Sequence, residues 1–222
     1  CNGDEWKYID SSSYNVQGDG NTRLLLHFDS DWNDVSASQH NMVNNGGTFS
    51  PGKFGNAICL DGVDDYVTTV YTSDFDFGSG DFTVDFWLKM NVFPADGYIM
   101  TVNEVPAGGW SQATFETQTN GPLHTRAEPS AWMSTGNNVI KTGQWQHLTL
   151  VRSGTTLKTF VDGIQVTTTT ISGSLTNDAI NGVFIGKRAG GAYINGCVDE
   201  VRISKGVARW TSNFTPPTEP YS

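Results

Sequence analysis

The chain has 222 residues and a formal net charge of −10, and only 16% of its residues are charged. Nucleic-acid binding needs lysine and arginine clustered against the phosphates, so the acidic balance argues against a nucleic-acid partner. No apolar run approaches the length of a membrane span, which argues against a transmembrane segment.

The composition indicates short strands joined by tight turns. The chain holds 25 glycines and many threonine, serine and asparagine residues, which favour strands and turns. Segments with the 3.6-residue period of a helix are hard to find. We therefore predict an all-β fold with twelve or more short strands in a single antiparallel sandwich.

The first strand signal follows a polar segment. Residues 1–22 are rich in glycine and serine and show little alternation, so we expect an N-terminal extension or linker there. From Arg23 the sequence RLLLHFD alternates as a half-buried strand does. The segments NAICLD, DYVTTV and GDFTVDFWLKMN continue this pattern, and the third predicts that Phe82, Phe86 and Met90 share one face.

Three more strands are predicted within residues 143–170. A loop at SGTT and a type I′ turn at Asp162-Gly163 would join them as consecutive hairpins. His147 shares the parity of Trp145 here, and a structural role for this histidine is expected. The segments GVFIG and CVDEVRIS then close the series of strands.

Two of the three cysteines lie in strand-like segments. Cys59 and Cys197 are each followed two residues later by an aspartate. We predict a disulfide between them across neighbouring strands, and with it an oxidising, extracellular setting. Two buried free thiols that pack as small apolar side chains are the alternative. No cysteine has the spacing of a zinc site.

The final strand segment contains an acid among apolar residues. Strict alternation places Cys197, Asp199, Val201 and Ile203 on one face. A buried carboxylate without a partner is costly, so Asp199 requires a cation, hydrogen-bond donors or access to solvent.

Four motifs together resemble a known family. ICLDGVDDYV, GDFTVDFWLK, GQWQHLTLVRSGTTLKTFVDG and CVDEVRIS occur in the order and spacing of the laminin-G-like, concanavalin A-like jelly rolls. The resemblance covers residues 23–214 and leaves 215–222 as a proline-rich C-terminal tail. The ending RISKGVARWTSNFTPP looks most like copies found in bacterial and phage surface proteins, including tail and fibre components. The resemblance implies two curved sheets, with a concave face that often holds glycan.

The resemblance also implies a calcium site. Related jelly rolls commonly bind this ion where the exit of the first strand meets the last strand. We therefore expect Asp34 and Asp199 as ligands, with Asp29 as a further candidate. Backbone hydrogen bonds or an arginine partner for Asp199 are the alternative. The segment VDD at 63–65 is a weaker candidate for a second oxygen cluster, because adjacent acids in a turn are often solvated caps.

Enzymatic activity is not predicted. The same fold hosts glycoside hydrolases and polysaccharide lyases, but the E-x-D-x-x-E arrangement expected of jelly-roll glucanases is absent. No histidine lies in a nucleophile motif. A fold alone implies no activity.

A ligand site is predicted mainly in residues 95–133, where aromatic residues stand among glycine, proline and polar residues. Sugars offer apolar faces and hydroxyls that suit aromatic platforms beside hydrogen-bonding groups. The predicted ligand-binding residues are Tyr98, Trp110, His124, Arg126, Trp132 and Tyr193. For any one of them, packing in the core or at an edge is the alternative.

The sequence therefore leads to two functions of different kinds. The first is a non-catalytic module that binds a glycan or cell-surface ligand, with calcium as a structural cofactor. The second is an assembly module that packs against neighbouring subunits of a virion fibre or surface layer. Cys1 would suit a lipid anchor at a bacterial surface. Either function places the protein outside the cell, at a cell surface or on a virion.

Overall fold

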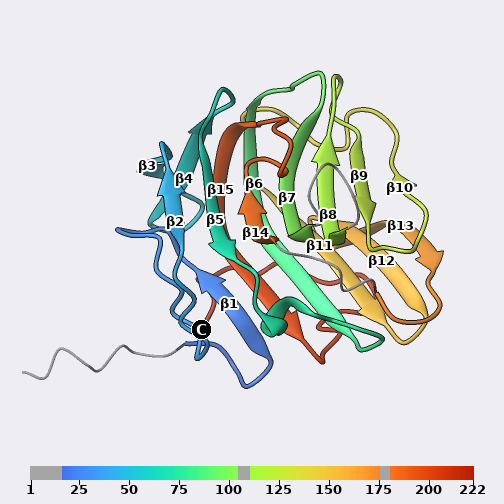
Figure 1. Cartoon of the computed structure of the whole chain (residues 1–222). Coiled ribbons are helices and arrows are strands. Elements are labelled where there is room, and N and C mark those ends of the chain that lie inside the picture. Colours follow the sequence, from blue (N-terminus) through green and yellow to red (C-terminus); the bar gives the residue numbers. More distant parts are fainter. Residues whose placement is uncertain (1–16, 105–110, 176–180) are drawn as a thin grey trace, which may run out of the picture.

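The computed structural model describes residues 17–104, 111–175 and 181–222, and two antiparallel sheets face each other in it (Figure 1). Fifteen strands lie in this part of the chain, with one short 3-10 helix, η1 (Ser73–Phe75). The predicted all-β sandwich is therefore confirmed. Trp110 and Cys1 lie outside the described residues.

The eight-stranded sheet contains the first and last strands. Seven of its strands run in the order β13 (Ile164–Thr170), β12 (Thr156–Val161), β11 (Gln146–Ser153), β6 (Phe82–Val92), β15 (Asn195–Lys205), β4 (Asn56–Asp61) and β3 (Thr48–Pro51). The eighth strand, β1 (Thr22–Leu26), pairs with the second half of β15. One edge of β15 is therefore shared by β4 and β1, which follow each other along it.

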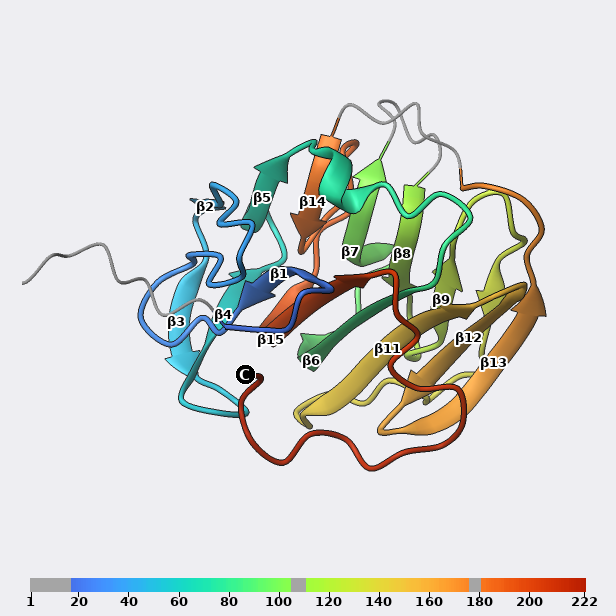
Figure 2. The same ribbon diagram turned by 90° about the horizontal axis from the view of Figure 1, so that it is seen from below.

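The seven-stranded sheet forms the other layer. Its order is β10 (Met133–Ser134), β9 (Leu123–Arg126), β8 (Ser111–Thr117), β7 (Gly97–Glu104), β14 (Asn181–Ile185), β5 (Tyr66–Val70) and β2 (Val43–Asn45). Figure 2 shows the two layers from below.

Alternating side chains fill the space between the sheets. On β6, Phe82, Phe86 and Met90 all lie in the buried core, as their spacing predicts. Burial of such side chains is the main favourable contribution to folding. The turn prediction also holds, because Asp162 and Gly163 both have positive φ, as a type I′ turn requires.

A segment that we call the C-terminal strap, residues 206–222, lies across the outer face of the eight-stranded sheet (Figure 2). The rings of Trp210 and Phe214 stack 4.1 Å apart, and both meet His147 edge-on. The amide of Tyr221 donates to Glu200 at 2.7 Å. The folded domain thus continues past residue 214 and includes much of the expected tail.

The strap covers a buried charge network. Arg202 binds the Asp85 carboxylate through Nη2 at 2.8 Å, and His147 Nε2 lies 3.5 Å from the same carboxylate. The Tyr221 hydroxyl reaches His147 Nε2 at 2.9 Å. Burial opposes the ionisation of Asp85, but the positive charge of Arg202 and a hydrogen bond with His147 hold its pKa well below its usual range. His147 therefore has the structural role expected of it.

The predicted faces of β15 are wrong after Asp199. The pairing with β6 shifts between Asp199 and Arg202, and Glu200 has a φ of 49°. This is a β-bulge, in which an extra residue on one strand reverses the alternation beyond it. As a result Val198, Val201 and Ile203 face the core. Asp199 lies at the bulge, where β1 replaces β4 as the neighbour of β15.

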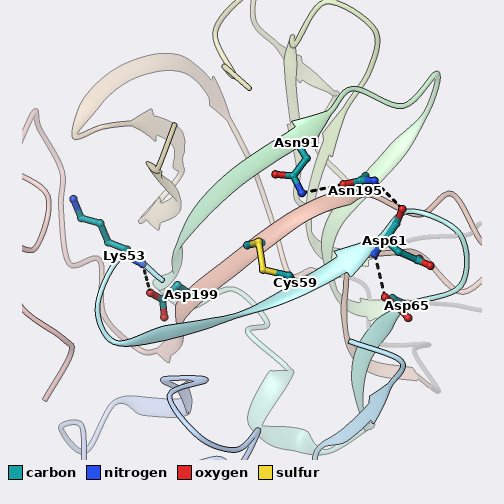
Figure 3. The surroundings of a disulfide bond; sticks show 8 residues. Lys53, Cys59, Asp61, Asp65, Asn91, Asn195 and Asp199 are labelled. Atoms are coloured by element: carbon teal, nitrogen blue, oxygen red, sulfur yellow. Dashed lines mark hydrogen bonds between the residues drawn. A yellow bond between two sulfur atoms is a disulfide. The ribbon is translucent and has the colours of Figure 1, made fainter. Parts of the chain in front are cut away.

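The predicted disulfide is confirmed. Cys59 on β4 and Cys197 on β15 are directly paired across the ladder and joined through their sulfur atoms (Figure 3). The bond closes a sequence separation of 138 residues. It attaches β4 to β15 just before the bulge at Asp199.

Candidate ligand-binding site

Four neighbouring strands bring polar side chains into one row on the outer face of the seven-stranded sheet. Tyr98 on β7 pairs with Glu116 on β8, which pairs with His124 on β9, which pairs with Ser134 on β10. Paired residues on one face lie about 5 Å apart, so these side chains can contact a common ligand. Their core-facing neighbours, such as Phe115 and Leu123, hold the row in place.

A hollow of about 450 Å³ opens above this row, and we call it the outer hollow. The described residues that line it are Asp96, Tyr98, Glu116, Gln118, His124, Trp132 and Ser134. Its volume lies within the range of small-ligand pockets.

A second hollow, the inner hollow, adjoins the first along the same strands and has a volume of about 180 Å³. Tyr98 and Trp132 belong to both hollows. The described residues lining the inner hollow are Tyr98, Glu104, Ser111, Thr114, Arg126, Glu128, Trp132 and Arg188.

Two aromatic rings of the site are each in contact with the guanidinium group of an arginine. The guanidinium of Arg126 lies 5.5 Å from the Trp132 ring centre, and that of Arg188 lies 4.8 Å from the Tyr98 ring centre. Arg126 also forms an ion pair with Glu128 and donates to the Ser130 carbonyl at 3.0 Å. These contacts fix the positions of both rings, as a cation beside an aromatic face does.

Three glutamates on this face are almost fully buried: Glu104 and Glu128 are 2% exposed, and Glu116 is 6% exposed. Burial raises the pKa of Glu104, although the amide of Ala189 donates to it at 2.8 Å and opposes the shift. Burial also raises the pKa of Glu116; a hydrogen bond from Gln118 opposes this, and the negative charge of Asp96 adds to it. Buried carboxyls in a ligand hollow indicate a functional site.

Tyr98 has a perturbed hydroxyl. Burial, followed by the negative charge of Glu116, raises the pKa of Tyr98 to about 12. The hydroxyl therefore stays protonated and can donate, while the Arg188 Nη1 lies 3.3 Å from its oxygen. It can thus serve as a hydrogen-bonding group for a polar ligand.

The structure brings four of the six predicted ligand residues together: Tyr98, His124, Arg126 and Trp132 all line these two hollows. Tyr193 lies elsewhere, in a hollow of about 390 Å³ beside Tyr66 and Lys187. Trp110 lies outside the described residues.

Sequence reasoning missed the glutamates and Arg188. The signal for Glu116 lies in the alternation of SQATFET, where Thr114 and Glu116 have opposite parity to the core residues Ala113 and Phe115. Glu128 and Arg188 lie beyond the ends of β9 and β14, where alternation gives no guidance.

The three predicted calcium ligands fall into two groups: Asp34 is held by β1 and its own loop, whereas Asp29 and Asp199 both accept amides of residues 53–56. Both carboxylate oxygens of Asp34 accept hydrogen bonds, from the amides of Leu25 and Ser36 on one oxygen and from His40 on the other. Burial opposes its ionisation, yet these bonds lower the pKa of Asp34 below its usual value.

Asp29 and Asp199 both accept hydrogen bonds from the loop at residues 53–56, and one oxygen of Asp199 remains available to a further ligand. Asp29 accepts the Asn56 amide at 3.0 Å. Asp199 Oδ2 accepts the Lys53 amide at 2.8 Å (Figure 3). The same oxygen accepts the Phe54 amide at 3.0 Å. Its buried Oδ1 has no hydrogen-bond partner within the described residues. Of the three, Asp199 therefore fits a cation best.

Asp61, Asp64 and Asp65 form an acidic turn. Within the described residues, it is the one group of three or more side chains of metal-ligating types that lie close together. Ligand atoms of Asp61, Asp64 and Asp65 lie within 4.8 Å of one another. Backbone amides of the turn donate to its carboxylates: Asp61 accepts the Val63 amide at 2.8 Å, and Asp65 accepts the Asp61 amide at 3.1 Å. This supports the expected capping role.

Comparisons with known proteins agree with the fold. A family model described as "Concanavalin A-like lectin/glucanases superfamily" matches residues 61–211. No curated protein sequence matches the chain. None of the described helices has the length and hydrophobicity of a membrane span.

Three solved structures illustrate the similarity. The binding domain of Paraclostridial Mosquitocidal Protein 1 is 16% identical, with a TM-score of 0.67 over 84% of this chain and 49% of that one. Domain 4 of AbnA, an extracellular arabinanase from Geobacillus stearothermophilus, was solved with arabinotriose; it is 18% identical, with a TM-score of 0.64 over 85% of this chain and 94% of that one. The Trypanosoma rangeli sialidase is 14% identical, with a TM-score of 0.68 over 86% of this chain and 32% of that one.

The chain thus spans about half of the binding domain of the mosquitocidal protein and about a third of the sialidase. At these identities the likeness shows the shared fold alone.

Proposed function

The chain belongs to the concanavalin A-like lectin/glucanase superfamily, and we propose that it binds a glycan on the outer face of its seven-stranded sheet without cleaving it. The observation that carries the proposal is the convergence of Tyr98, Trp132, His124 and Arg126 on two adjoining hollows. Aromatic rings beside fixed polar groups suit the apolar faces and hydroxyls of sugars.

The structural neighbours support the same proposal. Domain 4 of the arabinanase was solved with arabinotriose, and the mosquitocidal protein and a botulinum neurotoxin contribute binding domains. The sialidase among the neighbours is an enzyme. Hydrolysis must therefore be measured alongside binding.

Two further features belong to this proposal. The disulfide supports an extracellular location, since such bonds persist in oxidising compartments. A calcium ion at Asp199 would act as a structural cofactor, because it would neutralise a buried carboxylate where β1 and β4 meet β15. Cell-surface or virion attachment, including a lipid on Cys1, remains part of the expectation from the sequence.

The assembly alternative has less support. An assembly module would offer a free apolar face to neighbouring subunits. The C-terminal strap instead crosses the outer face of the eight-stranded sheet (Figure 2). Its Trp210 and Phe214 pack against His147, and its Tyr221 amide donates to Glu200. Light scattering tests this alternative, and a stable oligomer would favour it.

The binding proposal is tested by a screen of polysaccharides and surface glycans, with calcium present. We expect Trp132→Ala to weaken binding of the best ligand at least tenfold, about 1.4 kcal/mol, because the ring borders both hollows. Trp32→Ala is the matched control, because Trp32 is 37% exposed and Trp132 is 40% exposed. Release of reducing sugar is measured in the same samples.

Three results would contradict the proposal. They are an absence of binding by the folded protein across the screen, equal losses in both tryptophan variants, and steady release of reducing sugar. The last result would move the function to hydrolysis.

A further inference from the structure

The outer hollow has an unbalanced charge. Two carboxylates, Asp96 and Glu116, line it together with Tyr98 and Trp132, and no lysine or arginine lines it within the described residues. Glu116 is nearly buried, and burial raises its pKa although Gln118 Nε2 donates to it at 2.6 Å, so its ionised form gains little from water. A buried carboxylate of this kind gains from any cation that enters beside it.

The nearest arginines are already engaged. Arg126 pairs with Glu128 and donates to the Ser130 carbonyl, and Arg188 lies against the ring and hydroxyl of Tyr98. Both arginines line the inner hollow, where Glu104 and Glu128 balance them. Both arginines therefore belong to the inner hollow, and within the described residues no lysine or arginine lines the outer hollow beside Asp96 and Glu116.

His124 supplies hydrogen bonding in the outer hollow. Its Nδ1 lies 2.7 Å from the Ser134 hydroxyl, while its buried Nε2 has no hydrogen-bond partner in the described part of the chain. Because Glu116 and His124 are paired across β8 and β9, a ligand beside Glu116 also lies within reach of this nitrogen. A sugar hydroxyl can fill that position.

A bare metal ion fits this hollow less well than an organic cation. Among the described residues, Asp96, Glu116 and His124 do not form a group of three with ligand atoms within 4.8 Å of one another. The volume of about 450 Å³ and the rings of Tyr98 and Trp132 suit a larger ligand with an apolar face.

We infer that the outer hollow recognises a hexosamine that carries a free, protonated amino group. This inference rests on the proposed glycan binding and adds the chemical class of the ligand. The ammonium group would lie between Asp96 and Glu116, with the sugar ring against Trp132 or Tyr98. Acetylation of the nitrogen removes its charge, so the site should discriminate against the acetylated sugar.

The test compares three hexamers with the same β-1,4 backbone: hexaglucosamine, hexa-N-acetylglucosamine and cellohexaose. Binding is measured by calorimetry at about pH 6, where a free amino group is protonated, and at about 0.15 M salt, with EDTA present. We expect hexaglucosamine to bind at least tenfold more tightly than the other two. Glu116→Gln and Asp96→Asn should each reduce this preference while the chain stays folded.

Two controls separate recognition from simple attraction to an acidic protein. Glu219→Gln makes the same carboxylate-to-amide change at an exposed position beside Tyr221 in the strap, and it should leave the preference intact. Hexalysine, a cation without a sugar ring, should bind much more weakly than hexaglucosamine.

Equal binding of the three hexamers, or a preference unchanged in Glu116→Gln, would overturn the inference and leave glycan binding standing. Equal binding of hexalysine would overturn it as well, as would affinity that appears only when a divalent ion replaces EDTA. If none of the hexamers binds, the inference fails, and the wider screen with Trp132→Ala then decides the proposed function separately.

Discussion

Asp199 has two carboxylate oxygens with different surroundings. Oδ2 accepts two backbone amides, whereas the buried Oδ1 has no hydrogen-bond partner among the residues that the structure describes. Burial raises the pKa of Asp199 to about 7, and the negative charge of Glu200 contributes to this shift. Without a cation, this carboxyl is therefore easier to bury as the neutral acid.

The stability of the protein should then depend on pH through this residue. The folded pKa of about 7 exceeds the unfolded value of about 4, so between them the folded state keeps a proton that the unfolded state loses. The free energy of unfolding should fall as pH rises through this window, by at most about 1.4 kcal/mol per pH unit. Urea unfolding with EDTA present, from about pH 4 to pH 8, measures the slope, and Asp199→Asn should flatten it.

The same residue tests the calcium proposal. A bound ion would favour the charged carboxylate, remove this slope and raise the melting temperature. We expect EDTA to lower the melting temperature of the wild type and to have no effect on Asp199→Asn. If neither EDTA nor added calcium changes the melting temperature of the wild type, the calcium proposal is wrong. Asp199 then has only its hydrogen bonds to backbone amides.

At the scale of elements, the C-terminal strap should contribute strongly to stability. Its Phe214 ring packs against Phe160. Its Tyr221 ring lies over the guanidinium of Arg202, which is paired with Asp85. A Cβ on Gly163 would collide with the Phe214 carbonyl, so the β12–β13 turn and the strap are closely fitted.

Removal of residues 207–222 should lower the free energy of unfolding by about 5 kcal/mol, since each large aromatic side chain contributes about 1.5–3 kcal/mol when buried. Tyr221→Phe, which loses only the hydroxyl near His147, should cost about 1 kcal/mol. Urea denaturation compares both variants with the full chain. Unchanged stability after removal of the strap would show that it packs without contributing.

The elements also show what alternation could predict. The long strand β6 has no irregularity in its pairing with β11, so Phe82, Phe86 and Met90 were assigned correctly. On β15 the same rule failed at Glu200, because the bulge depends on how β1 and β4 meet one strand and not on the local sequence. The cysteine pair was predictable because both residues lie in clear strands.

The candidate site was predictable in the part that lies within residues 95–133. Tyr98, His124, Arg126 and Trp132 were named because they stand in a region of unusual composition, and all four line the two hollows. Their meeting with Glu104 and Glu128 requires the order β9, β8, β7 in the sheet, together with the loop after β9. Such long-range order is a property of the whole topology.

At the scale of the whole molecule, the disulfide limits the freedom of the unfolded chain. It joins residues separated by 138 positions, and closure of a loop of this length stabilises the folded state by about 5 kcal/mol on the chain-entropy estimate. The paired Cys59→Ala and Cys197→Ala variant should lose stability of this order in urea unfolding. A loss below about 1 kcal/mol would mean that the unfolded chain without the disulfide already has restricted conformational freedom.

The central position of β15 has a consequence for biosynthesis. Its partners β1, β4 and β6 begin at residues 22, 56 and 82, and β15 itself begins only at residue 195. During translation these earlier strands leave the ribosome long before the strand that joins them. Their exposed edges then have to be kept from pairing with other chains, and the eight-stranded sheet can close only after synthesis has passed Lys205.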